Sequence, residues 1–284
     1  MADAHDPRIT AARPDLAAAS LKGKVEAERF VTGESRLVIE TTAPLRRAPR
    51  HDAPLDTEAL YGERVTVFDI DGEGWAWGQL ESDGYVGYLP ANALVAPDDA
   101  PTHRVIAPRT FLYTQSDIKT PPLAPLSFGS LVAVKREADG FALTGRGAIF
   151  AKHLAPLAHR EPDIAATAQK FLGTPYLWGG KTSLGLDCSA LVQLSLAAAG
   201  ISCPRDSDMQ ERALGAPVPL GQARRGDLVF WKGHVGIVRD AGTLIHANGF
   251  HMAVAAEPLA AAIERIAALG TRVSSVKRIE AAAQ

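Results

Sequence analysis

The sequence predicts two small β-barrels followed by an α+β domain, and three observations lead to this fold class. Between Arg36 and Val95, short segments alternate apolar with polar or small residues and are separated by turn sequences such as DGEG and ESDG. Residues 104–157 repeat this pattern more weakly, and the two stretches end alike, in GYLPANALVA and AIFAKHLAPL. After Glu161, helical patterns come first and a consecutive run of strand patterns follows, which is typical of helices packed on an antiparallel sheet.

Changes in composition along the chain set the expected domain limits. We expect an N-terminal arm over residues 1–30, a first barrel over 31–98, a second barrel over 99–160 and the α+β domain over 161–284. The arm is a polar leader with one predicted helical piece, PDLAAASLKGKV, and the sequence PDDAP links the barrels. The second barrel lacks the paired tryptophans of GWAWG, and a spacer or packing role is expected for it.

Composition limits the classes of partner and the compartment. The 284 residues are 46% hydrophobic and 22% charged with a net charge of −2, which is typical of a globular protein and gives no electrostatic reason to expect nucleic acid or an anionic membrane as partner. No apolar run is long enough to span a membrane, and the N-terminus lacks the apolar core of a signal peptide. Two cysteines make no disulfide framework, and together with the missing signal peptide this indicates a reducing compartment, so we expect a cytoplasmic protein. Nothing in the sequence indicates a cofactor or an obligate protein partner, and we expect neither.

The α+β domain is expected to contain a buried helix and a series of strands. DIAATAQKFLG predicts a first helix, and DCSALVQLSLAAAG predicts a second one with Asp187 as N-cap and Gly200 at its end. The segments GDLVFW, HVGIVRD and TLIHANG predict three strands joined by short turns. PLAAAIERIAALG predicts a late helix and RVSSVKRI a final strand.

Cys188 is the sharpest chemical signal in the chain. It begins the second helix, where unpaired backbone N–H groups and the helix dipole favour a thiolate. Asp187 lies directly before it and works against a thiolate, because like charges raise each other's pKa. A buried, inert cysteine is the alternative interpretation of the same residue.

Two histidines give Cys188 a possible base. His234 opens the strand HVGIVRD and His246 lies in the next strand, LIHANG, so the two side chains can meet across a short turn. A thiol, a base and an orienting group are what nucleophilic catalysis by cysteine needs. The alternatives are two unrelated histidines, or a metal site formed by Cys188, His234 and His246.

Five motifs in order and spacing make the chemistry specific: FLGTPYLWGG, GLDCSALVQ, PRDSDMQ, RRGDLVFWKGHVGIV and LIHANG. They resemble the NlpC-type family of papain-like cell-wall peptidases over about residues 163–278. With tandem bacterial SH3-like barrels ahead of it, the chain resembles the γ-D-glutamyl-L-diamino acid endopeptidases, also called dipeptidyl-peptidase VI. The resemblance implies a papain-like catalytic domain and no metal.

The resemblance also implies the catalytic roles. It makes Cys188 the nucleophile, His234 the general base and His246 the orienting third residue, while Tyr176 lies near the nucleophile and helps to hold the oxyanion. The implied reaction is hydrolysis of the bond between γ-D-glutamate and meso-diaminopimelate or lysine in murein peptides with a free N-terminal L-alanine. It releases L-Ala-γ-D-Glu and points to recycling of cell-wall peptides. A murein amidase or acyltransferase on the same core, or a non-enzymatic wall-binding module, is the alternative.

The same resemblance assigns the substrate contacts. Asp187 with Glu63 and Tyr85 of the first barrel is expected to bind the substrate ammonium, Tyr88 being the alternative to Tyr85. Arg205 and Ser207 are expected to bind the free α-carboxylate of the γ-linked glutamate, or alternatively to cap a loop. Trp178 is expected to shape the wall of the site.

Overall fold

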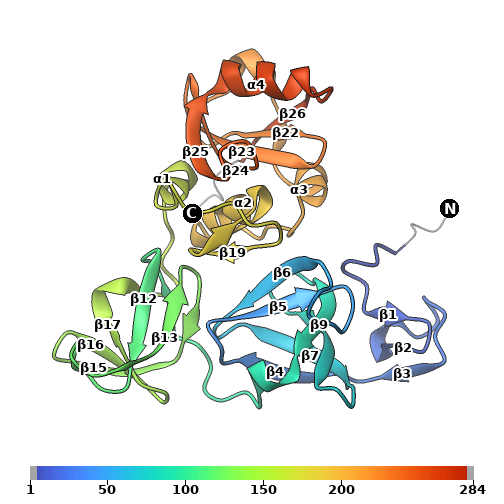
Figure 1. The fold of residues 1–284 in the computed structure, drawn as a ribbon, viewed down its shortest axis with the longest axis vertical. Helices are drawn as coiled ribbons and strands as arrows, with labels where there is room; N and C mark the ends of the chain where they lie inside the picture. Colours follow the sequence, from blue (N-terminus) through green and yellow to red (C-terminus); the bar gives the residue numbers. More distant parts are fainter. Residues whose placement is uncertain (1–4, 280–284) are drawn as a thin grey trace. The chain divides into compact units, whose positions relative to one another are not determined.

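The computed structural model describes residues 5–279 and divides into two compact units. The first unit ends at Leu157 and the second begins at Ala158. Figure 1 shows strands throughout the first unit and the main helices in the second. Within the described residues, no helix is both long and apolar enough to cross a membrane.

The N-terminal segment forms a small sheet, so the predicted helical piece is wrong. Strands β1 (Ala12–Arg13), β2 (Leu16–Ala18) and β3 (Arg29–Val31) pair in that order, and the helical residues between them form the single turn η1 (Ala19–Leu21). Leu16 and Ala18 are buried against Trp77 of the first barrel. Burial against this tryptophan outweighs the helix propensity of the alanine-rich sequence.

A seven-stranded sheet follows, with the order β10-β4-β7-β8-β9-β5-β6. Its strands are β4 (Glu34–Val38), β5 (Thr42–Arg46), β6 (Leu55–Leu60), β7 (Arg64–Ile70), β8 (Trp75–Leu80), β9 (Val86–Pro90) and β10 (Leu94–Val95), with the turn η2 (Ala91–Ala93). The alternating inward side chains make one core that includes Leu45, Val65, Leu80 and Leu89. The alternation that predicted strands in this region is therefore confirmed.

The rest of the first unit consists of a five-stranded sheet, β13-β12-β17-β16-β15, and a three-stranded sheet, β14-β11-β18. The strands are β11 (His103–Val105), β12 (Arg109–Tyr113), β13 (Pro122–Ser127), β14 (Leu131–Val132), β15 (Val134–Ala138), β16 (Phe141–Thr144), β17 (Ala148–Phe150) and β18 (Leu154–Pro156), with the turn η3 (Ala151–His153). Tyr61 of the first barrel packs into their core, and its carbonyl accepts a hydrogen bond from Leu131 N at 2.9 Å.

The second unit is an α+β domain around a six-stranded sheet of order β21-β26-β22-β23-β24-β25. The strands are β21 (Ala216–Pro217), β22 (Leu228–Trp231), β23 (His234–Asp240), β24 (Thr243–Asn248), β25 (Ala253–Pro258) and β26 (Val273–Arg278), all paired antiparallel. The helices are α1 (Ile164–Gln169), α2 (Cys188–Ala198), α3 (Ser207–Ala213) and α4 (Leu259–Ala268), with the turn η4 (Leu220–Gln222) and the pair β19 (Lys181–Thr182) and β20 (Gly185–Leu186).

Helices pack on this sheet, as the sequence of α+β elements predicts, and α2 and α4 do so most clearly. Helix α4 contributes Ala262 and Ile263 to a core with Val238 and Leu244 of the central strands. Helix α2 contacts β23 and β24, and nearly all of its residues are buried. The predicted helices and strands of this region are confirmed, whereas α3, β25 and the two-residue strands β19, β20 and β21 were not predicted.

Candidate active site

Cys188 lies at the first position of the buried helix α2, as predicted. The backbone of Asp187 is extended and its Oδ1 accepts a hydrogen bond from Ala190 N at 2.8 Å, which is an N-cap. The helix therefore begins at the cysteine because the preceding aspartate ends the extended chain and satisfies a first-turn N–H group. The thiol is free and buried.

The surroundings of the thiol favour its neutral form. Burial, followed by the charge of Asp187, raises the pKa of Cys188 to about 12, while the backbone N–H groups of Val235 and Ser189 and the charge of Arg205 act in the opposite direction. The expected opposition between Asp187 and a thiolate is therefore present. A base must take the proton when the thiol reacts.

The two predicted histidines meet each other. His234 is the first residue of β23, His246 lies in the neighbouring strand β24, and His234 Nε2 is 2.8 Å from His246 Nδ1. Burial, together with the charges of His246 and Arg265, lowers the pKa of His234 to about 3. The imidazole is therefore neutral at neutral pH, which is the state that can accept a proton. Val235, whose N–H points to the thiol, directly follows His234 and so connects this strand end to Cys188.

A glutamate and an arginine extend the histidine pair, and sequence reasoning missed both. His246 Nε2 is 2.7 Å from Glu257 Oε1, and Arg265 of α4 donates to the same oxygen. In β25, Glu257 pairs with Leu244, so its side chain shares a face of the sheet with Leu244 and His246. The sequence signal is weak, because Glu257 stands in a run of small residues, AVAAEP, that does not alternate clearly.

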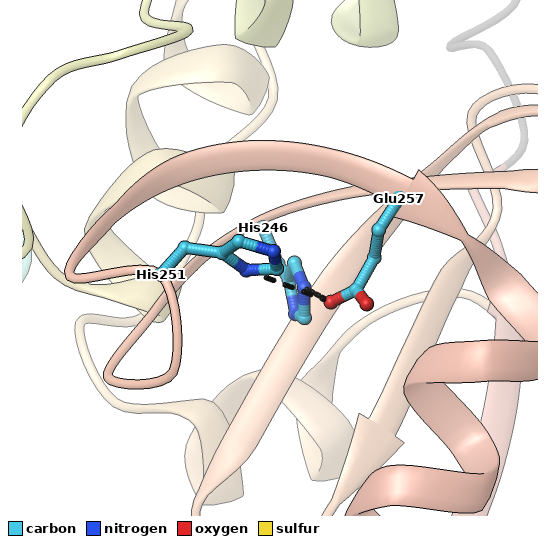
Figure 2. A group of neighbouring side chains, drawn as sticks. All are labelled: His246, His251 and Glu257. Carbon is cyan, nitrogen blue, oxygen red and sulfur yellow. Dashed lines mark hydrogen bonds and ion pairs between the residues drawn. The ribbon is translucent and has the colours of Figure 1, made fainter.

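Figure 2 shows His246, His251 and Glu257 with their side chains converging. Their potential metal-binding atoms lie within 4.8 Å of one another, and within the described residues this grouping does not include Cys188 or His234. His251 Nδ1 is 3.1 Å from Asn248 Oδ1, and the Glu257 oxygen already accepts from Arg265 and faces His246. Hydrogen bonds thus connect the residues of this cluster. The metal site considered from the sequence, formed by Cys188, His234 and His246, is a different set of residues from this cluster.

Arg205 is buried and pairs with the residue before the nucleophile. Its guanidinium contacts both oxygens of Asp187, at 2.9 and 2.6 Å, and the residue is 1% exposed. Its binding of a substrate carboxylate stays a prediction. The carboxylate of Asp187 balances the positive charge of Arg205 inside the protein, where an unpaired charge is costly. Arg205 therefore holds Asp187 in place.

Asp187 has more partners than the cap alone. Besides Ala190 N and Arg205, its carboxylate accepts from Gly179 N at 3.0 Å and Ser189 Oγ at 3.1 Å. A carboxylate offers about four lone-pair sites, so these donors occupy it fully. Binding of a substrate ammonium by Asp187 stays a prediction, and such an ammonium has to share or displace these contacts.

Three further predicted residues belong to the second unit. Tyr176 is half-buried, and burial, followed by the charges of Cys188 and Asp187, raises its pKa to about 12, so its hydroxyl remains a hydrogen-bond donor. Ser207 is buried at the first position of α3, and Trp178 is 67% exposed. Their roles at the oxyanion, the substrate carboxylate and the site wall stay predictions.

The predicted residues of the first barrel are both buried. Glu63 precedes β7, is 8% exposed and accepts a hydrogen bond from Leu60 N at 2.7 Å. Tyr85 lies in the core of the first barrel, whereas Tyr88 is partly exposed and its hydroxyl is 3.5 Å from Arg13 Nη1. A second buried carboxylate, Glu58 of β6, was not singled out from the sequence. The amine-binding roles of Glu63 and Tyr85 stay predictions.

Comparisons with known proteins identify the family of the chain. Residues 173–266 match the NlpC/P60 family and residues 45–94 match the bacterial dipeptidyl-peptidase Sh3 domain. A γ-D-glutamyl-L-lysine dipeptidyl-peptidase of Bacillus subtilis (strain 168) is 31% identical over 220 residues, covering 69% of this chain and 73% of the relative. A protein of the same name from Bacillus cereus (strain ATCC 10987 / NRS 248) is 28% identical, with 72% and 71% covered.

A solved structure supports the fold independently. The crystal structure of an NlpC/P60 family protein from Bacillus cereus ATCC 10987 superposes with a TM-score of 0.73 at 23% identity, covering 86% of this chain and 99% of that one. The fold is thus the papain-like NlpC/P60 fold with an SH3-like domain ahead of it. From its sequence relatives and its fold, this chain belongs to the NlpC/P60 family and is a peptidase.

Proposed function

We propose that this peptidase hydrolyses the γ-D-glutamyl bond to a diamino acid in murein peptides that carry a free N-terminal L-alanine. The observation that carries the proposal is the combination of Cys188 at a helix N-terminus with the hydrogen-bonded pair His234 and His246. The names of the two Bacillus relatives support the bond, and the match of the first barrel to a dipeptidyl-peptidase domain supports the release of a dipeptide.

The proposed mechanism is acyl transfer to the thiol. His234 takes the proton of Cys188, and the thiolate sulfur attacks the γ-carbonyl carbon of D-glutamate, forming a tetrahedral oxyanion. The backbone N–H of Cys188 and the hydroxyl of Tyr176 hold this oxyanion. The bond to the diamino acid then breaks, and His234 returns its proton to the leaving amine. Water, activated by the same imidazole, hydrolyses the thioester and releases L-Ala-γ-D-Glu.

A neutral pair in the resting enzyme fits this mechanism. Because the pKa of Cys188 is raised and that of His234 is lowered, the thiol keeps its proton and the imidazole is free to accept it. Proton transfer is then coupled to attack, and the chemistry proceeds by general-base catalysis.

Substrate selection is proposed to depend on the free amine. Carboxylates are strong acceptors for an ammonium in a partly dry site, and Asp187, Glu63 and the phenol of Tyr85 are the proposed ligands. Arg205 and Ser207 are the proposed ligands of the α-carboxylate of the γ-linked glutamate, and Trp178 is the proposed wall of the site.

The remaining predictions about the whole protein belong to the same proposal. We propose that residues 99–160 form a second SH3-like barrel, which the five-stranded and three-stranded sheets of this region support. We also propose that the enzyme acts in the cytoplasm on peptides released from the cell wall, without a cofactor.

Mass spectrometry of the products tests the proposal. Free L-Ala-γ-D-Glu-meso-diaminopimelate and its lysine counterpart should each be offered, together with the same peptides acetylated on the alanine amine. We expect rapid release of L-Ala-γ-D-Glu from the free peptides, with Cys188→Ala inactive. Losing a charged contact costs roughly 2–5 kcal/mol, so the acetylated peptides should react at least about 30-fold more slowly.

Three results would refute specific parts of the proposal. Equal turnover of free and acetylated peptide contradicts amine recognition but does not contradict the assignment of the cleaved bond. Cleavage only of the acyl–alanine amide of the acetylated peptides indicates a murein amidase. Full activity of Cys188→Ala contradicts the catalytic assignment.

A further inference from the structure

We propose that Glu257 is a positioning residue that sets the tautomers of both histidines, so that the ring nitrogen of His234 left for the thiol is a proton acceptor. This inference rests on the catalytic roles proposed above for Cys188 and His234. It concerns a residue on β25, a strand that the sequence did not reveal.

The geometry is a linear chain of hydrogen-bonding atoms. His234 Nε2 faces His246 Nδ1 at 2.8 Å, and His246 Nε2 faces Glu257 Oε1 at 2.7 Å. His246 is fully buried, so no solvent contact competes for its ring nitrogens. Figure 2 shows the His246 ring directed at the Glu257 carboxylate.

An ionised carboxylate can only accept hydrogen bonds, and this fixes the direction of the hydrogen bond between His246 Nε2 and Glu257 Oε1. Burial alone raises the pKa of Glu257, but the hydrogen bonds from Arg265 and His246 outweigh it and hold the pKa below its ordinary value. Glu257 is therefore ionised, and His246 Nε2 must carry the proton.

The remaining steps follow from the chemistry of neutral imidazole, which has one donor and one acceptor nitrogen. Burial lowers the pKa of His246, so its ring is neutral and its Nδ1 is an acceptor. His234 Nε2 must then donate to it, and His234 Nδ1 is left with a lone pair. Nδ1 is the nitrogen that does not face His246, and it is the one available to Cys188.

Without an acceptor at position 257, the opposite arrangement becomes accessible. His246 can then carry its proton on Nδ1 and donate to His234 Nε2. The proton of neutral His234 is in that case on Nδ1, where it blocks acceptance of the thiol proton. Asparagine in place of the triad aspartate of serine proteases has the same effect, giving the wrong tautomer with intact geometry.

Arg265 keeps this acceptor in place. Its guanidinium donates to the same Glu257 oxygen and lies 4.3 Å from the centre of the Phe250 ring. The charged and titratable groups around Glu257 are Arg265, His246 and His251, whose Nδ1 is 3.9 Å from the carboxylate. The arginine thus fixes the carboxylate from α4, the helix on the same face of the sheet.

Two variants of Glu257 separate hydrogen-bond acceptance from charge. Glu257→Met removes the acceptor at similar length. Glu257→Gln removes the charge but keeps an acceptor oxygen, and, unlike the asparagine variant of the serine-protease triad, this oxygen is held towards His246 because Arg265 can only donate to it. Glu211→Met is the matched control, because Glu211 is another glutamate of the second unit whose Oε1 accepts a hydrogen bond, from Ser275 Oγ at 2.6 Å. Circular dichroism and thermal unfolding verify that each variant is folded.

The primary measurement is the ¹⁵N NMR signal of the histidine ring nitrogens, which distinguishes protonated from unprotonated nitrogen without any substrate. In wild type and Glu211→Met we expect His234 Nδ1 to be unprotonated at pH 7. In Glu257→Met we expect protonated Nδ1 to become detectable, and in Glu257→Gln we expect the wild-type tautomer to persist. His234→Gln and His246→Gln assign the signals among the eight histidines.

The kinetic measurement is peptide cleavage together with alkylation of Cys188 by chloroacetamide, with peptide mapping to separate it from Cys203. General-base catalysis contributes about 10²- to 10⁴-fold, so kcat of Glu257→Met should fall by about 10² with KM nearly unchanged. Alkylation proceeds through the thiolate and needs no base at His234, so its rate should change little, and Glu257→Gln should recover much of the cleavage rate.

Two results would overturn the inference. One is an unchanged His234 tautomer in a folded Glu257→Met protein, and the other is an equal effect of Glu211→Met. Because the NMR measurement needs no substrate, failure of the proposed function is seen separately, as lack of cleavage by the wild-type enzyme.

Discussion

At the scale of single residues, the ion pair of Asp187 and Arg205 is the main finding that the sequence did not predict. Asp187 caps the helix that presents the nucleophile, and its negative charge opposes the thiolate. Arg205 offsets part of this effect, since its charge lowers the pKa of Cys188. The apparent conflict between a nucleophilic thiol and a neighbouring carboxylate is thus reduced by a buried cation.

The pair gives a prediction about stability and reactivity. Asp187→Asn leaves the buried guanidinium of Arg205 without its counter-charge, and breaking such a pair costs about 3–5 kcal/mol of the free energy of unfolding. Arg205→Met leaves the carboxylate of Asp187 beside the thiol without its counter-charge, and this should further raise the pKa of Cys188. Urea denaturation and alkylation rates measure the two effects. The double variant should be more stable than the sum of the single changes predicts, and simple additivity would argue against a coupled pair.

A second prediction concerns the pH dependence of Cys188. Because burial raises the pKa of the thiol to about 12 and lowers that of His234 to about 3, the free enzyme has no thiolate–imidazolium pair at neutral pH. The rate of alkylation by chloroacetamide should therefore rise continuously between pH 6 and pH 10. A plateau that begins below pH 7 would show a preformed ion pair and contradict the neutral resting state.

At the scale of elements, the short segment before α2 positions the nucleophile. Gly180 O accepts hydrogen bonds from Asp187 N at 3.2 Å and from Arg205 Nη2 at 3.4 Å. A Cβ on Gly180 would lie 2.5 Å from Gly185 O, which is backbone and cannot move aside without shifting the β19–β20 pair. Glycine is thus required here by the close approach of two chain segments.

We accordingly predict that Gly180→Ala impairs catalysis more than its modest chemical change implies. Forcing a methyl group into this contact should reduce the free energy of unfolding by about 1–3 kcal/mol and move the start of α2. Cleavage rate and urea denaturation should be measured together. Gly221→Ala is the matched control, because a Cβ there meets nothing within 4 Å and its effect should be small. A wild-type cleavage rate for Gly180→Ala would show that the segment tolerates the shift.

The elements also show what a single sequence can reveal. Alternation and caps predicted α2, β22, β23 and β24, so Cys188, His234 and His246 were found from local patterns. Strand β25 was missed, because its small side chains follow no clear period, and Glu257 was missed with it. The partnership of Asp187 with Arg205 joins residues 18 positions apart, and no local pattern records such a tertiary contact. The N-terminal sheet was missed for the same reason.

At the scale of the whole molecule, each compact unit has buried cores of its own. Leu45 and Leu126 belong to cores of the first unit, and Trp231 belongs to a core of the second. Unfolding of such a chain need not be a single two-state transition. The histidine pair belongs to the second unit, so its titration should act on the stability of that unit.

We predict that acid destabilises the second unit through His234. The ordinary pKa of a histidine side chain, expected for the unfolded chain, is 6.5, whereas burial lowers the pKa of His234 in the folded protein to about 3. The unfolded chain therefore binds more protons between these two values. Stability follows the difference in bound protons, so the free energy of unfolding should fall as the pH decreases from about 6.5 towards 3. Calorimetry at several pH values should show the corresponding transition moving to lower temperature. In His234→Gln this transition should depend less on pH, whereas parallel shifts in both proteins would show that other groups cause the acid sensitivity.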